Sequence, residues 1–262
     1  MASTSGTIEL RDHYSSHPQN SRQIRPHPSD ENSTATTAVD VSFLRRSATV
    51  VVLAGVTANG PLCNGILTVA LPSVAKDIKL SSNLILWPAS VFGLAAGCTL
   101  LIFGSLADVV GAKRIWLTGI SLYTVFTLGC GLVQTGFQII IFRVVTGIAL
   151  AMCLPTSVGI ITKAFPPGKG RNTAFSIIGV SQPFGFSVGL VAGGAFVNTI
   201  GWRSGFYISA ALAAILIPGG FWALPVDDSW GPSNWVRLRT EIDWVGASLI
   251  SVAFAIISYV LG

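Results

Sequence analysis

The sequence predicts an all-α polytopic membrane protein, and three observations carry this prediction. Only 10% of the 262 residues are charged, whereas a soluble domain carries about 25%. Hydrophobic residues make up 51% of the chain, and its mean hydropathy is +0.66. Long neutral intervals separate the charges beyond the first 46 residues. Neither a soluble fold nor extended disorder fits most of such a chain.

The first 46 residues differ in composition from the rest. They hold ten charged residues and all three histidines, and they are rich in Ser, Thr, Pro, Asn and Gln without an apolar period. This composition predicts a disordered tail over residues 1–46. The tail lacks the early apolar core of a signal peptide.

Seven neutral intervals of 19 residues or more follow the tail. A helix needs about 20 residues to cross a hydrocarbon core of about 30 Å. We therefore expect a six-helix unit over residues 47–225, a linker at 226–243 and a seventh helix at 244–262. The predicted helices cover 48–71, 84–106, 115–135, 138–161, 174–197, 205–225 and 244–262.

The distribution of Lys and Arg predicts the orientation. With the N-terminal tail in the cytoplasm, nine basic residues near the membrane lie inside and three lie outside, namely Lys76, Lys79 and Arg203. Because inner loops carry the excess of Lys and Arg, this bias favours a cytoplasmic N-terminus.

The segment between the second and third predicted helices reads Gly-Ser-Leu-Ala-Asp-Val-Val-Gly-Ala-Lys-Arg over residues 104–114. Gly104 is expected to let two backbones approach, and Gly111 permits a turn with positive φ. An ordinary basic loop would carry the same charges. The spacing resembles the signature loop of the major facilitator superfamily, whose gate motif falls on Gly104, Asp108, Gly111, Lys113 and Arg114.

This resemblance implies a fold and a mechanism. The fold is a six-helix half of a carrier, built from two three-helix repeats. In that family the aspartate engages a helix N-terminus across the cytoplasmic gate and stabilises the outward-facing state, so Asp108 would have that role.

The fourth predicted helix contains a lone charge, Arg143, about five residues inside its end. A charge at the bilayer centre costs roughly 2.5 kcal/mol or more. Snorkelling of the side chain to the outer interface and an interior functional position are both open. The Arg followed four residues later by Gly147 resembles the family's helix 4 motif, whose Arg faces the interior and is implicated in proton transfer.

The fifth predicted helix carries glycines spaced by four, which predicts close packing against another helix. The stretch resembles the family's antiporter motif, Gly-x-x-x-Gly-Pro-x-x-Gly-Gly. Leu190 replaces the proline of that motif, and Pro183 offers a bend instead. The resemblance favours antiport over uptake. The packing motif comprises Gly185, Gly189, Gly193 and Gly194.

Two further segments resemble the drug:proton antiporters with fourteen helices. They are Gly-Trp-Arg at 201–203 and Ile-Asp-Trp-Val-Gly-Ala at 242–247. With the long hydrophilic tail, they are similar to fungal members. The first predicted helix departs from this pattern, because Cys63 stands where the family often has a membrane-embedded Asp. No carboxylate lies in the middle of a predicted span, which weakens the expectation of proton coupling.

Three uncharged polar residues complete the predicted proton and substrate pathway around Arg143. A substrate pocket at the midplane could be lined by Asn59, Asn64 and Gln182. Hydrogen bonding between helices without substrate contact is the alternative for each.

The cysteines lack paired spacing, so neither zinc nor a disulfide framework is predicted. Without a nucleotide loop, a catalytic triad or paired carboxylates, the sequence predicts no enzyme and no cofactor.

These features predict a multidrug-type exporter of small molecules in the plasma or vacuolar membrane, exchanging substrate for protons by alternating access. The expected partners are the lipid bilayer, a small-molecule substrate, protons and a missing C-terminal half, and nucleic acid is not among them. The alternative is a truncated, non-transporting fragment, or a half-transporter that needs a partner chain. A seven-helix receptor is disfavoured because receptors of that type have an external N-terminus.

Overall fold

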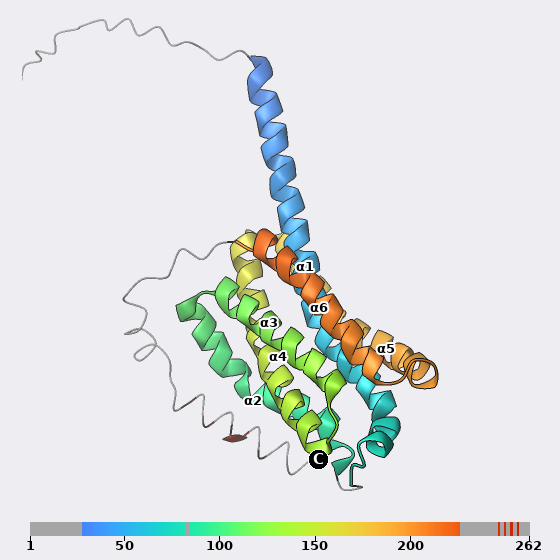
Figure 1. Cartoon of the computed structure of the whole chain (residues 1–262). Helices are drawn as coiled ribbons and strands as arrows, with labels where there is room; N and C mark the ends of the chain where they lie inside the picture. Colours follow the sequence, from blue (N-terminus) through green and yellow to red (C-terminus); the bar gives the residue numbers. More distant parts are fainter. Residues whose placement is uncertain are drawn as a thin grey trace, which may run out of the picture. The chain divides into compact units, whose positions relative to one another are not determined.

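The computed structural model describes residues 28–81 and 84–225, with side chains from Leu44 onward, and single positions between 246 and 256. Every regular element bounded within these ranges is an α-helix, which confirms the predicted fold class (Figure 1). The helices are α1 (Pro28–Asp77), α2 (Trp87–Val110), α3 (Ala112–Leu132), α4 (Gly136–Ala164), α5 (Lys169–Asn198) and α6 (Arg203–Ala223).

Each of these six helices contains a stretch long and apolar enough to cross a membrane. α4 and α5 extend beyond the predicted spans, so that Lys163 and Lys169 lie within their terminal turns. Basic side chains are favourable there because the ends of a span reach the polar headgroup region. The predicted linker at 226–243 lies outside the described residues, as does the predicted seventh helix at 244–262 apart from single positions.

The start of α1 differs from the predicted one. The helix begins at Pro28 and not at residue 48, so residues 28–46 are helical where their composition predicts disorder. Proline suits the first turn of a helix because its missing N–H would be unpaired there in any case. The chain divides into two compact units after Val41, and the second unit begins at Ser42.

Two apolar clusters fill the interior of this second unit. One surrounds Leu53, Trp116 and Leu150, and the other surrounds Leu67 and Phe206. Along the chain, buried polar residues fall between the members of the two clusters on α1, α3, α4 and α6. We call them the central polar layer: Asn59, Thr127, Arg143, Thr146 and Ser209.

The glycine stripe of α5 packs directly on the backbone of α1. A Cβ atom at Gly185 or Gly189 would overlap the carbonyl oxygen of Ala58 or Leu62, respectively, and one at Gly193 would lie 2.9 Å from the Cα of Ile66. The close packing predicted for these three positions is therefore present.

Gly194 does not belong to this contact, contrary to the prediction. A Cβ atom at Gly194 would meet no atom within 4 Å. The reason is helical geometry, since the next residue along a helix is rotated by about 100° and leaves the packed face.

Hydrogen bonds define the two ends of the bundle. At one end, which we call the Arg45 end, Lys113 donates to the carbonyl of Leu224 at 2.9 Å and Thr49 donates to that of Ala223 at 3.0 Å. The last carbonyls of a helix lack intrahelical partners and attract cations, so these side chains complete the C-terminus of α6. At the other end, which we call the Asp77 end, Asp77 meets Arg203 at the start of α6.

Gly189→Ala is expected to destabilise the protein by about 1–3 kcal/mol, because its methyl group would press on a backbone carbonyl that cannot rotate away. The matched control is Gly194→Ala, which adds the same group in open space and gains helix propensity. Unfolding by SDS titration of mixed micelles measures both. Equal unfolding midpoints for the two variants would refute the proposed backbone contact.

Candidate functional site

Arg143 lies in the interior of the bundle, in the first half of α4. Its side chain is 1% exposed, so the interior position is the one that the structure adopts, and not snorkelling. The Nε atom donates to the carbonyl of Pro88 at 3.0 Å, and a second nitrogen donates to the side-chain oxygen of Asn64. The guanidinium also lies over the ring of Phe92, 4.4 Å from its centroid. Arg143 thus joins α4 to α1 and α2.

Gly147 explains how α2 comes within reach of Arg143. A Cβ atom at Gly147 would overlap the carbonyl oxygen of Phe92 and lie 3.1 Å from the Cβ of Ala95. The two backbones can therefore approach only because position 147 has no side chain. The Arg and the Gly of the helix 4 motif therefore act together. Gly147 lets the α2 backbone pack closely on α4, and Arg143 then hydrogen-bonds to α2.

Cys63 lies beside the guanidinium at the position where the resemblance leads one to expect Asp. Its sulfur is 3.9 Å from a terminal nitrogen of Arg143, a weak contact. Among the described residues, no carboxylate forms an ion pair with Arg143. The positive charge is therefore held by a carbonyl, an amide oxygen, a thiol and an aromatic face.

Asn59 occupies a different part of the central polar layer. Its amide nitrogen donates to the carbonyl of Ser209 at 2.9 Å, and its side-chain oxygen accepts from the Ser209 hydroxyl at 2.9 Å. The Tyr123 hydroxyl lies 3.2 Å from that of Ser209 and donates to the carbonyl of Asn59 at 3.3 Å. These bonds connect α1, α3 and α6, so Asn59 takes the interhelical role that was the alternative to lining a pocket.

Gln182 lies on the exposed surface of α5, away from the contacts of Arg143. The neighbouring Ser181 faces α1 instead, where its hydroxyl lies 2.8 Å from that of Thr57. Of the four residues predicted for the pathway, the structure therefore brings together Arg143 and Asn64. It joins them to Cys63, Pro88 and Phe92, which the pathway prediction did not include.

The loop between α2 and α3 consists of one residue. Gly111 has φ 108° and ψ 130°, a left-handed conformation that favours glycine. Its N–H donates to the carbonyl of Ala107 at 3.0 Å and ends α2. Gly104 does not allow a close backbone approach within the described residues, contrary to the prediction, since a Cβ there would lie 3.7 Å from that of Pro155.

The charged residues of this loop have separate surroundings. Lys113 donates to the carbonyls at the end of α6, while Arg114 is exposed. Asp108 is exposed in the last turn of α2 and has no hydrogen-bond or ion-pair partner within the part of the chain that the structure describes. A carboxylate at a helix C-terminus is disfavoured by the helix dipole, so Asp108 would gain from a donor outside its own helix.

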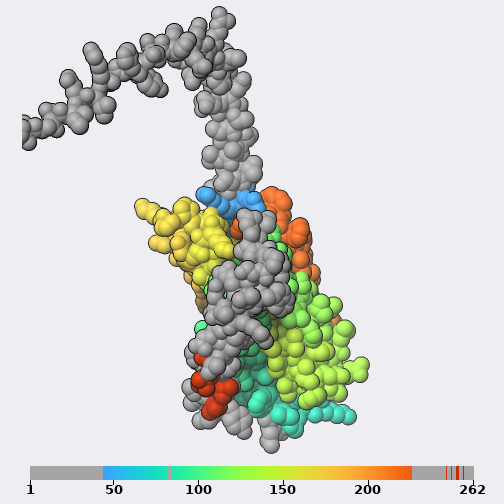
Figure 2. All heavy atoms as spheres, turned by 90° about the vertical axis from the view of Figure 1, so that its left-hand side faces the viewer, coloured from blue at the N-terminus to red at the C-terminus, as the bar shows by residue number. Residues whose placement is uncertain are grey.

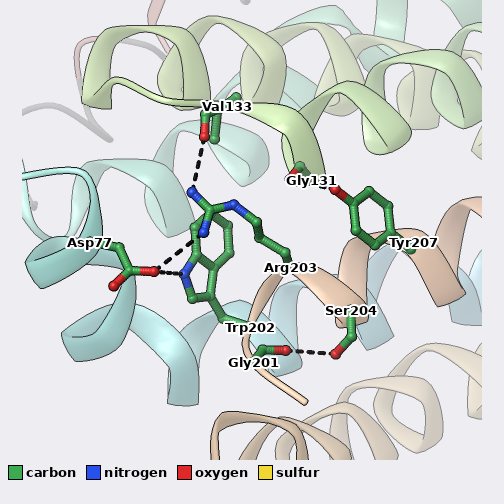
Figure 3. Close-up of polar contacts among 8 residues, drawn as sticks. All are labelled: Asp77, Gly131, Val133, Gly201, Trp202, Arg203, Ser204 and Tyr207. Atoms are coloured by element: carbon green, nitrogen blue, oxygen red, sulfur yellow. Dashed lines mark hydrogen bonds and ion pairs between the residues drawn. The ribbon is translucent and has the colours of Figure 1, made fainter.

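A polar cluster at the Asp77 end was not anticipated from the sequence. Figure 3 shows Asp77 facing Trp202 and Arg203. The indole nitrogen of Trp202 donates to the carboxylate at 2.8 Å, and Arg203 lies 3.3 Å from it. Arg203 also donates to the carbonyl of Val133 at 3.3 Å and stacks on Trp202 at 4.5 Å. The sequence signal was a lone acid at the end of a span, with a single Arg at the start of another.

Within the described residues, no group of three His, Cys, Asp or Glu side chains could hold a metal ion. Cys63, Cys98, Cys130 and Cys153 are free thiols.

Comparisons with known proteins agree with this architecture. Residues 53–261 match the family model described as Major Facilitator Superfamily. The chain is 42% identical to MFS-type transporter 1 of Pyricularia oryzae, over 84% of this chain and 40% of that protein. It is 28% identical to multidrug resistance protein Stp of Mycobacterium tuberculosis, over 58% of this chain and 28% of that protein.

Solved structures resemble the fold at low sequence identity. The peptide transporter POT in complex with sulfate matches with a TM-score of 0.62 and 18% identity, over 80% of this chain and 46% of that chain. A bacterial homologue of the human lysosomal transporter Spinster matches with a TM-score of 0.52 and 20% identity, over 71% and 44%. The chain thus spans less than half the length of these proteins.

The Asp77 cluster predicts a measurable coupling between α1 and α6. Asp77→Asn and Arg203→Gln should show an interaction free energy of about 0.2–1 kcal/mol in a double-mutant cycle, since the pair is half exposed. SDS titration provides the unfolding free energies. Asp77→Asn combined with Arg114→Gln, at the other end of the bundle, should be additive. A coupling no larger than in this control would count against the ion pair.

Proposed function

Because the chain belongs to the Major Facilitator Superfamily, we propose that it acts in small-molecule transport by alternating access, in which one half of a carrier rocks against the other. The six apolar helices that the structure describes make it a multi-pass membrane protein. The observation that carries the proposal is the buried charge of Arg143, held against Asn64, Cys63 and the α2 backbone. An ionisable residue inside a membrane bundle is costly and characteristic of a transport pathway.

We propose further that the transported compounds are drug-like and are exported. The similarity to multidrug resistance protein Stp supports this direction, as does the glycine stripe of α5. Its close contact with the α1 backbone is the kind of packing that the antiporter motif provides in the family that this stretch resembles.

Proton antiport is the coupling mode we propose, with one chemical restriction. A guanidinium does not exchange its proton in proteins, so an arginine contributes a fixed positive charge. A titratable group elsewhere has to carry the proton. Neither Asp77 nor Asp108 is among the residues that bond to Arg143.

The orientation that we propose puts the Arg45 end of the bundle in the cytoplasm. Three basic residues, Lys76, Lys79 and Arg203, lie near the Asp77 end, whereas the Arg45 end has Arg45, Arg46, Lys113, Arg114, Lys163, Lys169 and Arg171. This asymmetry fits the positive-inside rule. The plasma and vacuolar membranes are the proposed locations. In this orientation Asp108 faces the cytoplasm and is the proposed gate residue, engaging a helix N-terminus of a second half.

The second half is the main proposed partner. The chain spans 40% of the length of MFS-type transporter 1, so a continuing chain or a separate subunit would complete the carrier. A fragment without transport activity is the alternative function. In either case the bilayer is the surrounding partner.

A flux assay in proteoliposomes tests transport. With an acidic lumen, protein-containing vesicles are expected to accumulate ethidium faster than empty ones, and collapse of the pH gradient with nigericin should abolish the difference. Ethidium movement that persists without the gradient would refute antiport. Movement of neither ethidium nor riboflavin, the compound named for a relative that is 29% identical, would favour the non-transporting alternative.

Arg143→Met is expected to separate stability from function. The substitution removes a buried charge, which is favourable, but it also takes a donor from the Asn64 amide oxygen and the Pro88 carbonyl, which is unfavourable. Because the two effects oppose each other, the unfolding free energy should change by no more than about 1–3 kcal/mol. Ethidium flux should fall by about tenfold or more, equivalent to about 1.4 kcal/mol. Lys76→Gln, an exposed charge at the Asp77 end, is the control and should retain flux. If Arg143→Met unfolds the protein instead, the role of Arg143 is structural.

A further inference from the structure

A groove lies at the Arg45 end, between the beginning of the α1 span and the beginning of α5. It has a volume of about 660 Å³ and is bordered by the loop between α4 and α5. Figure 2 shows this loop and the start of α5, in yellow, beside the beginning of the α1 span, in blue. Because both helices cross the membrane, the groove lies where their ends reach the boundary between hydrocarbon and headgroups.

The polar side of the groove is basic. Arg46 approaches from α1, and Lys169 and Arg171 approach from α5. None of the described residues that line the groove is acidic. Arg171 also lies over the ring of Phe175, 5.6 Å from its centroid. Three cations around one concave surface favour an anionic ligand.

The start of α5 adds to this preference. The helix runs for 30 residues from Lys169, and its N-cap is Gly168, which has no side chain to accept the first amide N–H groups. Those amides lack intrahelical partners, and the positive end of the helix dipole lies at the same place. A phosphate ester would be bound by amides and basic side chains together.

The other side of the groove is apolar. Val51 of α1 and Ile177 of α5 line it with 66% and 44% of their surfaces exposed, and Phe165 lines it from the loop. A free phosphate ion would leave these side chains uncovered. A ligand with an anionic headgroup and a hydrocarbon chain would satisfy both sides at once.

We propose that this groove is a binding site for an anionic phospholipid. The phosphate lies among Arg46, Lys169 and Arg171, and an acyl chain runs along Val51 and Ile177 toward the bilayer. The site joins the α1 and α5 ends through a lipid, beyond the glycine stripe that joins their backbones. The lipid site does not depend on the transported substrate, so it can be tested separately from the proposed transport.

Native mass spectrometry of the full chain tests the site. The protein is released from micelles containing equal amounts of dioleoyl phosphatidylserine and dioleoyl phosphatidylcholine. We expect phosphatidylserine adducts on the wild-type protein. Lys169→Gln with Arg171→Gln should weaken them by about tenfold or more, and Arg46→Gln alone by about fivefold, since each basic residue contributes to binding at an anionic surface.

The matched control is Lys76→Gln with Lys79→Gln, which removes the same charge at the Asp77 end and should leave the adducts unchanged. Equal loss in this control would show general charge attraction and overturn the site. The site would also be overturned if the wild-type protein retained as many phosphatidylcholine adducts as phosphatidylserine adducts. The same holds if Lys169→Gln with Arg171→Gln and Arg46→Gln both kept the wild-type level of phosphatidylserine adducts. If sn-glycerol 3-phosphate displaces the adducts and stabilises the protein as well as the lipid does, the groove binds free phosphate esters and the lipid assignment is wrong.

Discussion

A polar group inside a bilayer can bond only to the protein itself, because hydrocarbon offers no donor or acceptor. The arrangement of this bundle follows from that constraint. Backbone groups are paired within helices, and five of the nine buried polar side chains that the structure describes lie between two apolar clusters, in the central polar layer. Asn59 and Ser209 exchange two hydrogen bonds within it. At the Arg45 end, the last carbonyls of α6 have no amide partner within the helix. Lys113 and Thr49 donate hydrogen bonds to the carbonyls at this end.

Arg143 is the residue for which this constraint is hardest to satisfy. Its charge has a carbonyl, an amide oxygen, a thiol and an aromatic ring as partners among the described residues, and none of these partners is negative. Such an arrangement depends on close approach of α2, which Gly147 permits. In the transport role that we propose, a buried charge with only dipolar partners would attract an anion or a carboxylate that arrives during a conformational change. This is the physical reason for linking Arg143 to transport rather than to stability.

The glycines of α5, together with Gly104 and Gly147, show which packing contacts a sequence can predict. Spacing by four correctly predicted that Gly185, Gly189 and Gly193 share one packed face, because an α-helix returns to the same side after about four residues. Spacing did not identify α1 as the packed neighbour, and adjacency in sequence wrongly added Gly194. Gly104 and Gly147 were both part of recognised motifs. Only the packing of the helices distinguishes Gly147, which contacts a backbone, from Gly104, which has room for a methyl group.

The sequence by itself determined the class of the protein, the approximate positions of its six described spans and a turn with positive φ at Gly111, although the predicted spans left a longer connection there than the single residue that the structure has. Each of these follows from local composition: neutral intervals as long as a bilayer is thick, and a glycine where φ has to be positive. Tertiary structure decided which polar residues meet. It joined Asn59 to Ser209 and Asp77 to Trp202, separated Gln182 from Arg143, and surrounded Arg143 with residues of two other helices, α1 and α2. Residues more than 50 positions apart come together through the rotation and tilt of whole helices, and no local pattern encodes those.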